Sequence, residues 1–366
     1  MTPSVAIIGT RGYPSFYGGF ETAVRYLVPY LAEAGWDVTV YAREKAPSEV
    51  DFGERIHVRR TRGVETRSLS TLSYGLTASV NAIRRKPDVA LVMNVANGFF
   101  LPLMRQRGIP SVVNVDGIEW EREKWGRLAR RTFFAGAQLT ARYANELVFD
   151  ANAIGDRWRE RWGRDGVFIP YGGEESPGLH PVANDLPRRG YVLAVARFVP
   201  ENSIQEFLDA AQQLAEAHPV VLVGSSGYGG ELEERAALLA REKTNFTWLG
   251  HVRDDQLLHS LWQNAGVYFH GHSVGGTNPA LVQAMALGAP TLARDTVYNR
   301  EVLGDAGVHW AQPHEIVDRA KAVLADPALQ DRLSAKAVER ARSEYSWALV
   351  CERYEATLRR VAGLSS

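Results

Sequence analysis

The chain of 366 residues has a single cysteine, no net charge and no apolar run long enough to span a membrane. One cysteine, Cys351, excludes an intramolecular disulfide and fits a reducing compartment. The 42 basic and 42 acidic residues balance, so the basic surplus that is typical of nucleic-acid-binding proteins is missing. No charged and hydrophobic leader precedes the first strand pattern. We therefore expect a cytoplasmic protein without a membrane span and without a nucleic-acid partner.

Two common ligand motifs are also missing. A dinucleotide fingerprint beginning at Gly9 would need glycine at positions 11 and 14, where the chain has Arg11 and Pro14. His270 and His272 have a spacing that suits a metal, but no third ligand is evident nearby, so we favour an orienting or hydrogen-bonding role. We expect neither a bound metal nor a permanently bound cofactor.

What the chain has is an alternation of short β-branched runs and amphipathic helical stretches, which is typical of parallel α/β proteins. Residues 170–190, rich in Pro, Gly and polar side chains, separate two such series and have the composition of an interdomain linker. The pattern predicts two doubly wound domains that bind ligands beyond the carboxyl ends of their strands. The predicted strands are Ser4–Gly9, Asp37–Tyr41, Asp88–Met93, Ser111–Val115 and Leu147–Phe149, then Tyr191–Ala196, Val220–Val223, Phe246–Trp248, Gly266–Phe269 and Thr291–Ala293.

Loops that follow predicted strands contain residues suited to an anionic ligand. Gly18 and Gly19 precede a helix predicted over Glu21–Gly35, so they either open the N–H groups of the helix start to a ligand or form a plain flexible cap. Arg197 follows a strand in VARFVPENSIQEF and can clamp a phosphate. The alternative for this arginine is a surface ion pair with Glu201.

The longest such signal is the stretch HGHSVGGTNPALVQAMALGAP, residues 270–290. It predicts a helix with Asn278 as its N-cap and Pro279 as its first residue. The N–H groups of such a helix start can hold an anion or sugar hydroxyls. Two less specific loops, VGSSGYGG and WLGHVRDDQL, add further candidate ligand contacts: Gly224, Ser225, His251 and Val252.

Together these segments resemble the retaining glycosyltransferases of family 4, in which two facing Rossmann-like domains form the GT-B fold with a cleft between them. The N-terminal half is similar to the rhamnosyltransferase-like branch. The resemblance extends from Val5 to about Gly307 and rests on GTRGYPSFYGGFET, NVDGIEWEREKWG, VFIPYGGE, RFVPEN and the 270–290 stretch. It implies an acceptor-side domain over residues 1–175, a nucleotide-sugar-binding domain over 176–345, and a last helix, 346–366, that returns to the first domain.

The resemblance also implies which residues form the site. Arg197, Asp116 and Asn202 are the catalytic candidates, and Asp116 would face the sugar and the acceptor, with a helix N-cap as its alternative role. Arg197 and Asn202 are also expected to contact the sugar donor. The other candidates for contact with the sugar donor are Gly18, Gly19, Gly224, Ser225, His251, Val252, His272, Gly275, Gly276, Thr277, Asn278 and Gln283.

Three of these positions depart from the family pattern. Asn202 stands where a lysine that neutralises the leaving diphosphate is usual, and Gly275 and Gln283 stand where the family has two glutamates. The Gly-Gly-Thr-Asn-Pro turn of the rhamnosyltransferase-like branch accounts for Gly275. Gln283 can still accept a hydrogen bond from ribose, but a charged acceptor contributes about 1.5–3 kcal/mol against about 0.5–1.5 kcal/mol for a neutral one. We therefore expect weaker binding of the sugar donor, or a donor on deoxyribose such as a dTDP-sugar.

The implied reaction is a retaining transfer of a sugar, a deoxysugar such as rhamnose included, from a UDP- or dTDP-sugar to a glycan, natural-product or lipid-linked saccharide. The nucleotide sugar is a substrate here. Trp158 and Trp162 lie on one helical face among arginines, which suits peripheral contact with the inner face of an anionic membrane; the alternative turns them into the core. The rival functions are a GT-B epimerase that uses His272 or Asp116, and a nucleotide-sugar-binding protein without catalysis.

Overall fold

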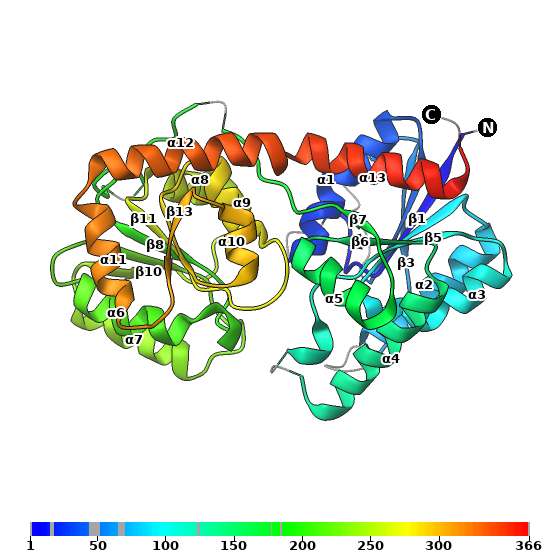
Figure 1. Cartoon of the computed structure of the whole chain (residues 1–366), viewed down its shortest axis with the longest axis horizontal. Helices are drawn as coiled ribbons and strands as arrows, with labels where there is room; N and C mark the ends of the chain where they lie inside the picture. The colour runs from blue at the N-terminus through cyan, green and yellow to red at the C-terminus, as the bar shows by residue number, and fades with distance from the viewer. Residues whose placement is uncertain are drawn as a thin grey trace. The chain divides into compact units, whose positions relative to one another are not determined.

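The computed structural model describes residues 2–14, 18–43, 52–64, 70–122, 125–176, 178–183 and 185–364 (Figure 1). The chain divides into two compact units. The N-terminal unit consists of residues 1–171 and 347–366, and the C-terminal unit of residues 172–346. The boundaries predicted from the sequence fall at residues 175 and 345.

The N-terminal unit contains a seven-stranded parallel sheet with the strand order β3-β2-β1-β4-β5-β6-β7. Its strands are β1 (Ser4–Ile8), β2 (Asp37–Ala42), β3 (Ile56–Arg60), β4 (Val89–Met93), β5 (Ser111–Asn114), β6 (Glu146–Phe149) and β7 (Val167–Phe168). Its helices are α1 (Gly19–Glu33), α2 (Ser70–Arg85), α3 (Leu101–Gln106), α4 (Arg127–Tyr143), α5 (Asn152–Trp162) and α13 (Trp347–Ala362), with 3₁₀ turns η1 (Val95–Phe100) and η2 (Glu119–Glu121).

The C-terminal unit contains a six-stranded parallel sheet with the order β10-β9-β8-β11-β12-β13. Its strands are β8 (Val192–Val195), β9 (Val220–Val223), β10 (Phe246–Trp248), β11 (Val267–His270), β12 (Thr291–Arg294) and β13 (Gly307–Trp310). Its helices are α6 (Ile204–Leu214), α7 (Glu231–Glu242), α8 (Asp255–Asn264), α9 (Pro279–Ala286), α10 (Val297–Leu303), α11 (Glu315–Leu324) and α12 (Pro327–Glu344), with the 3₁₀ turn η3 (Pro200–Asn202).

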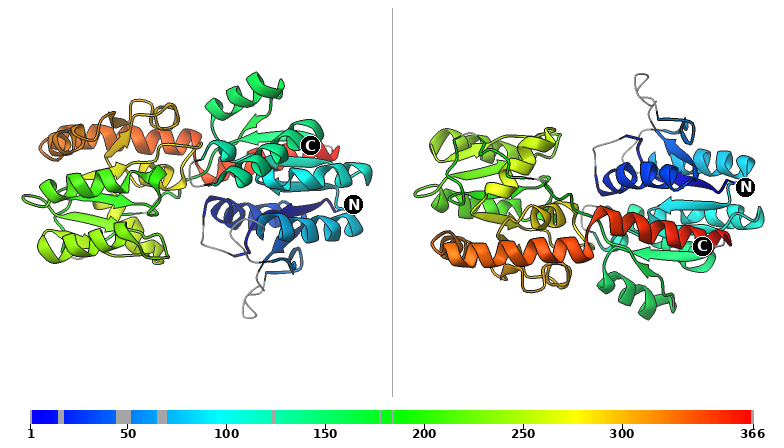
Figure 2. Two further views of the ribbon diagram at one scale, coloured as in Figure 1. Left: turned by 90° about the horizontal axis from the view of Figure 1, so that it is seen from below. Right: turned by 90° about the horizontal axis from the view of Figure 1, so that it is seen from above.

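The central strands are largely buried and mostly apolar, because helices cover both faces of each sheet (Figure 2). All five residues of β4, VALVM, are buried, and so are all four of β9, VVLV. Each unit therefore has its own hydrophobic core, built around its own sheet. Two separate cores in one chain of this length agree with two doubly wound domains.

The predicted α/β architecture is confirmed. Every strand predicted from the sequence is present, and each end agrees to within one residue. Three strands were not predicted. In β3, IHVRR, charged and apolar residues mix, β7 is only two residues long, and β13, GVHW, is an edge strand with one fully buried residue.

The last helix, α13, packs into the core of the N-terminal unit. The Trp347 ring stacks on Tyr26 of α1 with the ring centres 4.3 Å apart. The Asn114 side-chain amide, at the end of β5, donates a hydrogen bond of 2.7 Å to the Tyr354 hydroxyl. Cys351 lies in the same core, where burial raises the pKa of its thiol to about 12, so the thiol is unreactive near neutral pH.

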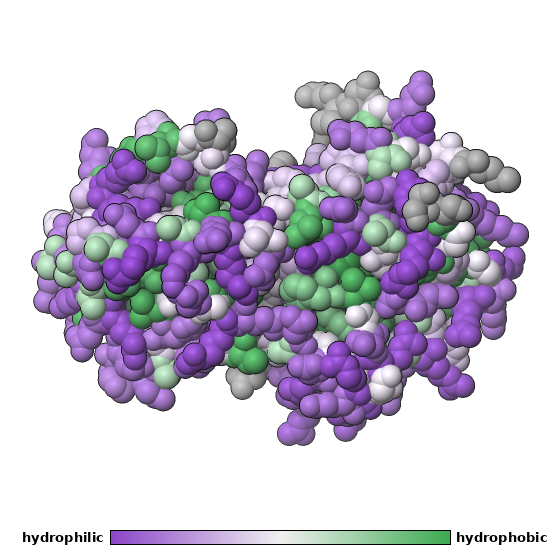
Figure 3. Space-filling view, turned by 45° about the horizontal axis from the view of Figure 1, so that its top comes forward, coloured by the Kyte–Doolittle hydropathy of each residue, from purple (hydrophilic) through white to green (hydrophobic). Residues whose placement is uncertain are grey.

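The helices within the described ranges are each too short or too polar to cross a bilayer. Hydrophilic side chains cover most of the face that Figure 3 shows, with apolar residues scattered among them. Such scattering is ordinary on the surface of a globular domain.

Candidate functional site

The chain order of the C-terminal sheet reverses between β8 and β11. Ligands of doubly wound sheets bind at the carboxyl ends of strands at such a reversal. Two loops leave the sheet there, residues 196–203 and 271–278, which we call the switch-point loops. The Ser203 hydroxyl donates to the Gly271 carbonyl at 2.7 Å, and the Ser273 N–H donates to the Glu201 carbonyl at 2.8 Å. The two loops therefore hold each other in place.

Asn202 connects two other predicted site residues, Arg197 and His272. Its side-chain N–H donates to the Arg197 carbonyl at 2.8 Å, and its side-chain oxygen lies 2.7 Å from Nδ1 of His272. Since an amide oxygen can only accept, Nδ1 of His272 carries the proton of this bond. Asn202 is 9% exposed, so this bridge is largely shielded from water.

Arg197 lies two residues after the end of β8 and is exposed. Its guanidinium makes no hydrogen bond or ion pair with the residues that the structure describes. The alternative role, an ion pair with Glu201, is wrong. The charge of Arg197 is thus available to a ligand at the end of the strand.

Glu201 is a residue of this loop that sequence reasoning did not select. It is 7% exposed, and neither carboxylate oxygen has a hydrogen-bond partner among the described residues. Buried carboxylates normally have partners, so two unsatisfied acceptors within a ligand-type loop mark Glu201 as a further candidate. Its place directly before Asn202 was the available signal in the sequence.

The helix predicted after residue 277 is confirmed as α9. Asn278 caps it by accepting the Ala280 N–H at 2.9 Å, and Pro279 is its first residue. Gly275 has φ +91°, a conformation that favours glycine, and Thr277 is buried. Gly276 lies between them, so these three residues shape the turn that leads into α9.

Gln283 lies in the second turn of α9, and its amide pairs with the backbone of one residue. Its oxygen accepts the Glu174 N–H at 3.0 Å, and its N–H donates to the Glu174 carbonyl at 2.9 Å. A glutamate could accept the first bond but could not donate the second. This pairing is therefore a physical reason for an amide at position 283.

Gly224, after β9, connects three loops. Its N–H donates to the Gly250 carbonyl at 2.6 Å, and its own carbonyl accepts from the Trp248 indole at 2.9 Å. The Ser225 carbonyl accepts the Phe198 N–H at 3.2 Å, which connects this loop to the first switch-point loop. The predicted contacts His251 and Val252 directly follow Gly250 at the exposed end of β10.

In the N-terminal unit, Gly18 is the N-cap of α1 with φ +117°, and Gly19 is the first helical residue. A Cβ on Gly19 would lie 2.9 Å from the Tyr171 hydroxyl oxygen. The Tyr171 ring could therefore keep this position only if residue 19 is glycine. Residues 15–17 of the same predicted loop lie outside the described residues. The Glu21 carboxylate in the first turn accepts the Arg11 N–H at 2.9 Å, and its burial raises its pKa.

Asp116 lies two residues after β5 and has φ +60°. Its carboxylate accepts from the Asn94 amide at 3.4 Å, and Asn94, directly after β4, has φ +74°. Left-handed conformations of non-glycine residues cluster at functional sites. The alternative role of Asp116 as a helix N-cap is wrong, because the next turn, η2, is capped by Ile118. That alternative assumed a helix over Glu119–Trp125, of which residues 123 and 124 lie outside the described residues.

The tryptophans proposed for membrane contact belong to an aromatic cluster. The Trp158 side chain is fully buried and its ring centre lies 4.5 Å from that of Trp162, which is half-buried. Trp120 lies edge-on to both, at 6.2 and 5.5 Å. For Trp158 the alternative, a place in the core, is confirmed.

His270, at the end of β11, is buried, and burial lowers its pKa to about 3. In the unfolded chain a histidine titrates near pH 6.5. Between these values the unfolded chain binds a proton that the native chain does not, so the free energy of unfolding should fall by up to about 1.4 kcal/mol for each pH unit below about 6. Urea unfolding of the wild type and of His270→Gln from pH 7 to pH 4 measures this, and equal pH slopes would contradict it.

For His270 and His272 the sequence favours an orienting or hydrogen-bonding role over metal binding. Among the residues that the structure describes, no three histidine, cysteine, aspartate or glutamate side chains come together as a possible metal site. His272 instead bonds to Asn202, and the Tyr268 hydroxyl lies 3.3 Å from Nδ1 of His270.

Two parallel-sheet domains with this strand order define the GT-B fold class. Sucrose-phosphate synthase from Thermosynechococcus elongatus has the same fold, with a TM-score of 0.81 and 18% sequence identity over 99% of this chain and 100% of that chain. HepE of Anabaena, in complex with UDP-glucose, has a TM-score of 0.76 and 15% identity over 98% of this chain and 99% of that chain. At such identities the likeness concerns the fold.

Family comparison gives the particular domains. Residues 181–340 match the family described as "Glycosyl transferases group 1", and residues 18–172 match "Glycosyl transferase 4-like domain". The first match lies within the C-terminal unit, and the second covers most of the N-terminal unit. Phosphatidyl-myo-inositol mannosyltransferase of Mycolicibacterium smegmatis is 31% identical over 233 residues, and O-antigen chain mannosyltransferase B of Escherichia coli is 28% identical over 173 residues. The matches cover 60% of this chain and 59% of the first relative, and 44% of this chain and 44% of the second.

Proposed function

We propose that the protein is a retaining glycosyltransferase that moves a sugar from a nucleoside diphosphate sugar to a saccharide or lipid-linked saccharide acceptor. The observation that carries this proposal is the exposed Arg197 guanidinium at the switch point of the C-terminal sheet, where its backbone is fixed through Asn202 and His272. A cation at this place suits a diphosphate. The two glycosyltransferase domain matches support the same reaction class.

The proposed step breaks the bond between the anomeric carbon and the diphosphate oxygen, and the electron pair stays on the diphosphate. The acceptor oxygen bonds to the anomeric carbon on the same face, and its proton passes to the leaving diphosphate. Stabilising a developing anion with a fixed cation lowers such a barrier. Arg197 has this role in the proposal, and Asp116, through its carboxylate, orients the acceptor hydroxyl.

Asn202 has a supporting role in this proposal. Its amide has no charge, and both of its polar atoms already bond within the protein. It therefore cannot replace the lysine that the family has at this position. Asn202 instead fixes the loop backbone from which Arg197 extends, and Arg197 carries the charge alone at this end of the sheet.

Nucleotide binding tests which sugar donor the enzyme uses. If Gln283 selects against ribose, calorimetry with UDP, dTDP and GDP, with and without Mg²⁺, should show the tightest binding for dTDP and weaker binding for UDP. Gln283→Glu should then shift the preference toward UDP. If Gln283 instead serves the Glu174 backbone, the same variant should weaken all three nucleotides equally, because it loses one of two hydrogen bonds to that segment.

Preference for UDP would keep the reaction class and remove the deoxysugar inference, and preference for GDP would favour a mannosyl donor, in line with the names of the relatives.

Turnover with the preferred nucleotide sugar then distinguishes the transferase from the epimerase and from the binding protein without catalysis. Transfer to free saccharides or to lipid-linked saccharides in anionic vesicles supports a transferase, and vesicle-dependent transfer supports peripheral membrane contact of a cytoplasmic enzyme. Conversion of the sugar without acceptor indicates an epimerase. Nucleotide binding without turnover indicates a binding protein.

A further inference from the structure

The balanced charge of the whole chain conceals a difference between its two units. The N-terminal unit has 27 Lys and Arg against 20 Asp and Glu, and the C-terminal unit has 15 against 22. A positive surplus of this size attracts an anionic partner to the N-terminal unit. The exposed cations of this unit that have no internal partner decide which face such a partner contacts.

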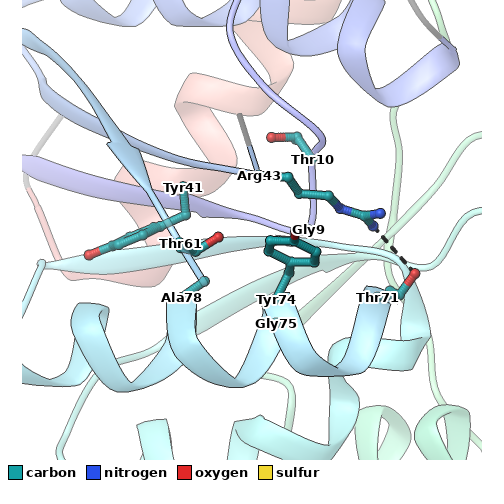
Figure 4. A pocket seen from close by; sticks show the side chains of 9 residues that line it. All are labelled: Gly9, Thr10, Tyr41, Arg43, Thr61, Thr71, Tyr74, Gly75 and Ala78. Carbon is teal, nitrogen blue, oxygen red and sulfur yellow. Dashed lines mark hydrogen bonds between the residues drawn. The ribbon is translucent and has the colours of Figure 1, made fainter. Parts of the chain in front are cut away.

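Several arginines of the N-terminal unit use their charge internally. Arg43 extends to Thr71, where Nη2 donates to the hydroxyl at 3.4 Å, and it lies beside the Tyr74 ring in a small pocket at the ends of β1, β2 and β3 (Figure 4). Arg360 pairs with Glu146 at 2.7 Å. Arginines of this kind add little to the attraction of a partner.

The start of α4, at the lower edge of the N-terminal unit in Figure 1, is different. Arg127, Arg130 and Arg131 are exposed, and neither Arg127 nor Arg131 makes a hydrogen bond or ion pair with any residue that the structure describes. The sequence from position 124 to 145 contains no Asp or Glu. Positive charge at the start of a helix is disfavoured by the helix dipole. Local conflicts of this kind are expected where residues serve function.

The acidic side chains described shortly before α4 do not neutralise these arginines. Glu119 pairs with Arg122 at 2.7 Å, and Glu121 pairs with Arg157. Each of these carboxylates therefore has a cation of its own. The positive charge at the start of α4 stays uncompensated by them.

The start of α4 is fixed to the rest of the unit. Nε of Arg130 donates to the Trp120 carbonyl at 2.8 Å, and the Trp120 ring lies edge-on to the fully buried Trp158. Arg161 of α5, which is exposed, lies over the Phe134 ring of α4 at 4.6 Å and adds a further cation beside the helix. The charges are thus presented on a packed part of the unit.

An exposed apolar side chain lies among these arginines. Leu128 is 79% exposed, the second residue of α4. Close to it in the sequence, the half-buried rings of Trp125 and Phe133 lie 5.2 Å apart. Arginines alone would suit any polyanion, but the surface of an anionic bilayer also takes up leucine and aromatic side chains. The combination therefore favours a membrane.

We infer that Arg127, Leu128, Arg130, Arg131 and Arg161, which we call the α4 surface, contact anionic lipid headgroups. The contact is thus assigned to α4 and not to the tryptophans of α5 that the sequence had suggested. That a lipid-linked acceptor is brought in this way rests on the proposed function, whereas the contact with lipid does not.

The α4 surface lies close in the chain to the acceptor side of the proposed reaction. Asp116, which orients the acceptor hydroxyl in the proposal, precedes η2 by three residues, and η2 is bonded to α4 through Arg130. A lipid-linked acceptor held at the α4 surface would therefore have its saccharide delivered to the same unit as Asp116.

Cosedimentation of the full chain with phosphatidylcholine vesicles, with and without one third phosphatidylglycerol, tests this inference. Binding should require phosphatidylglycerol and should be lost at about 0.5 M NaCl, because salt screens exposed charges. The double variant Arg127→Gln, Arg131→Gln should bind about 25-fold more weakly, at about fivefold for each arginine. Leu128→Ser should bind about tenfold more weakly, because it removes the apolar contact.

Two further double variants serve as controls. Arg241→Gln with Arg332→Gln removes two exposed arginines of the C-terminal unit and should leave vesicle binding unchanged. Arg127→Lys with Arg131→Lys keeps the charge and should keep the binding. Urea unfolding of the Arg127→Gln, Arg131→Gln variant should show no loss of stability, since its two removed charges oppose the helix dipole.

Equal binding to vesicles without phosphatidylglycerol, or undiminished binding by Arg127→Gln, Arg131→Gln, would overturn the inference. A DNA duplex that binds as tightly as the anionic vesicles would also overturn it, because the surface would then attract any polyanion. Sugar transfer to a free saccharide, measured without vesicles, keeps the two proposals apart. Transfer without vesicle binding leaves the proposed function and removes the α4 surface, and vesicle binding without any transfer or nucleotide binding does the reverse.

Discussion

Replacing Arg197 by alanine is expected to lower kcat by about 10²–10³-fold and to leave the free energy of unfolding almost unchanged. The rate falls because the leaving diphosphate loses its cation, and Asn202 cannot replace it. Stability is spared because the exposed guanidinium makes no bond to the described part of the chain. Steady-state kinetics with the preferred nucleotide sugar, combined with urea unfolding, measure both quantities.

Two further variants test whether the expected loss of kcat in Arg197→Ala is due to the missing positive charge at this position. Arg197→Lys should recover part of the rate, because an ammonium supplies charge without the bidentate geometry. Arg241→Ala, at an exposed arginine on α7, should behave as the wild type. Arg197→Ala with a rate close to the wild type would remove this residue from the mechanism.

Replacing Gly224 by alanine should lower the free energy of unfolding of the C-terminal unit by about 3 kcal/mol or more. Gly224 has φ +124°, and a Cβ there would lie 1.9 Å from the Ala196 carbonyl oxygen, which is backbone and cannot move away cheaply. The loops after β8, β9 and β10 meet at this residue, so nucleotide binding should be lost as well. Urea unfolding and calorimetry with the preferred nucleotide give the two readouts.

Gly227, in the same loop, is the matched control for Gly224. It also has a positive φ, +80°, but a Cβ there meets no atom within 4 Å. Gly227→Ala should therefore cost only the backbone strain of about 1 kcal/mol. If both variants lose the same stability, steric contact with Ala196 is not what requires glycine at position 224.

The architecture could be predicted from the sequence because parallel strands that are buried on both faces have continuous runs of apolar residues. Strands such as β4 and β9 have that form, and they were predicted with nearly correct ends. The edge strand β3 was missed because its residues are only half-buried and include arginines. The cap of α9 was predictable because Asn-Pro is a local signal.

The candidate site was predictable as a set of loops but not as a set of contacts. Asn202 and His272 are 70 residues apart, and Glu174 and Gln283 are 109 apart, so only the folded sheets bring them together. Asn and Asp adopt a positive φ more readily than other non-glycine residues, but most of them do not, so the sequence could not single out Asn94 and Asp116. Nor could the sequence show that the Glu201 carboxylate is buried without a hydrogen-bond partner among the described residues.

The position of α13 has a consequence for the order in which the protein is made. The N-terminal unit is built from the first and the last segments of the chain, whereas the C-terminal unit is continuous. During synthesis the ribosome delivers all of residues 172–346 before Trp347, Tyr354 and Leu358 emerge to fill the N-terminal core. The N-terminal unit therefore begins synthesis first but completes its core last. Until α13 has been synthesised, the sheet of this unit exposes an apolar face, the kind of surface that makes folding intermediates prone to aggregation.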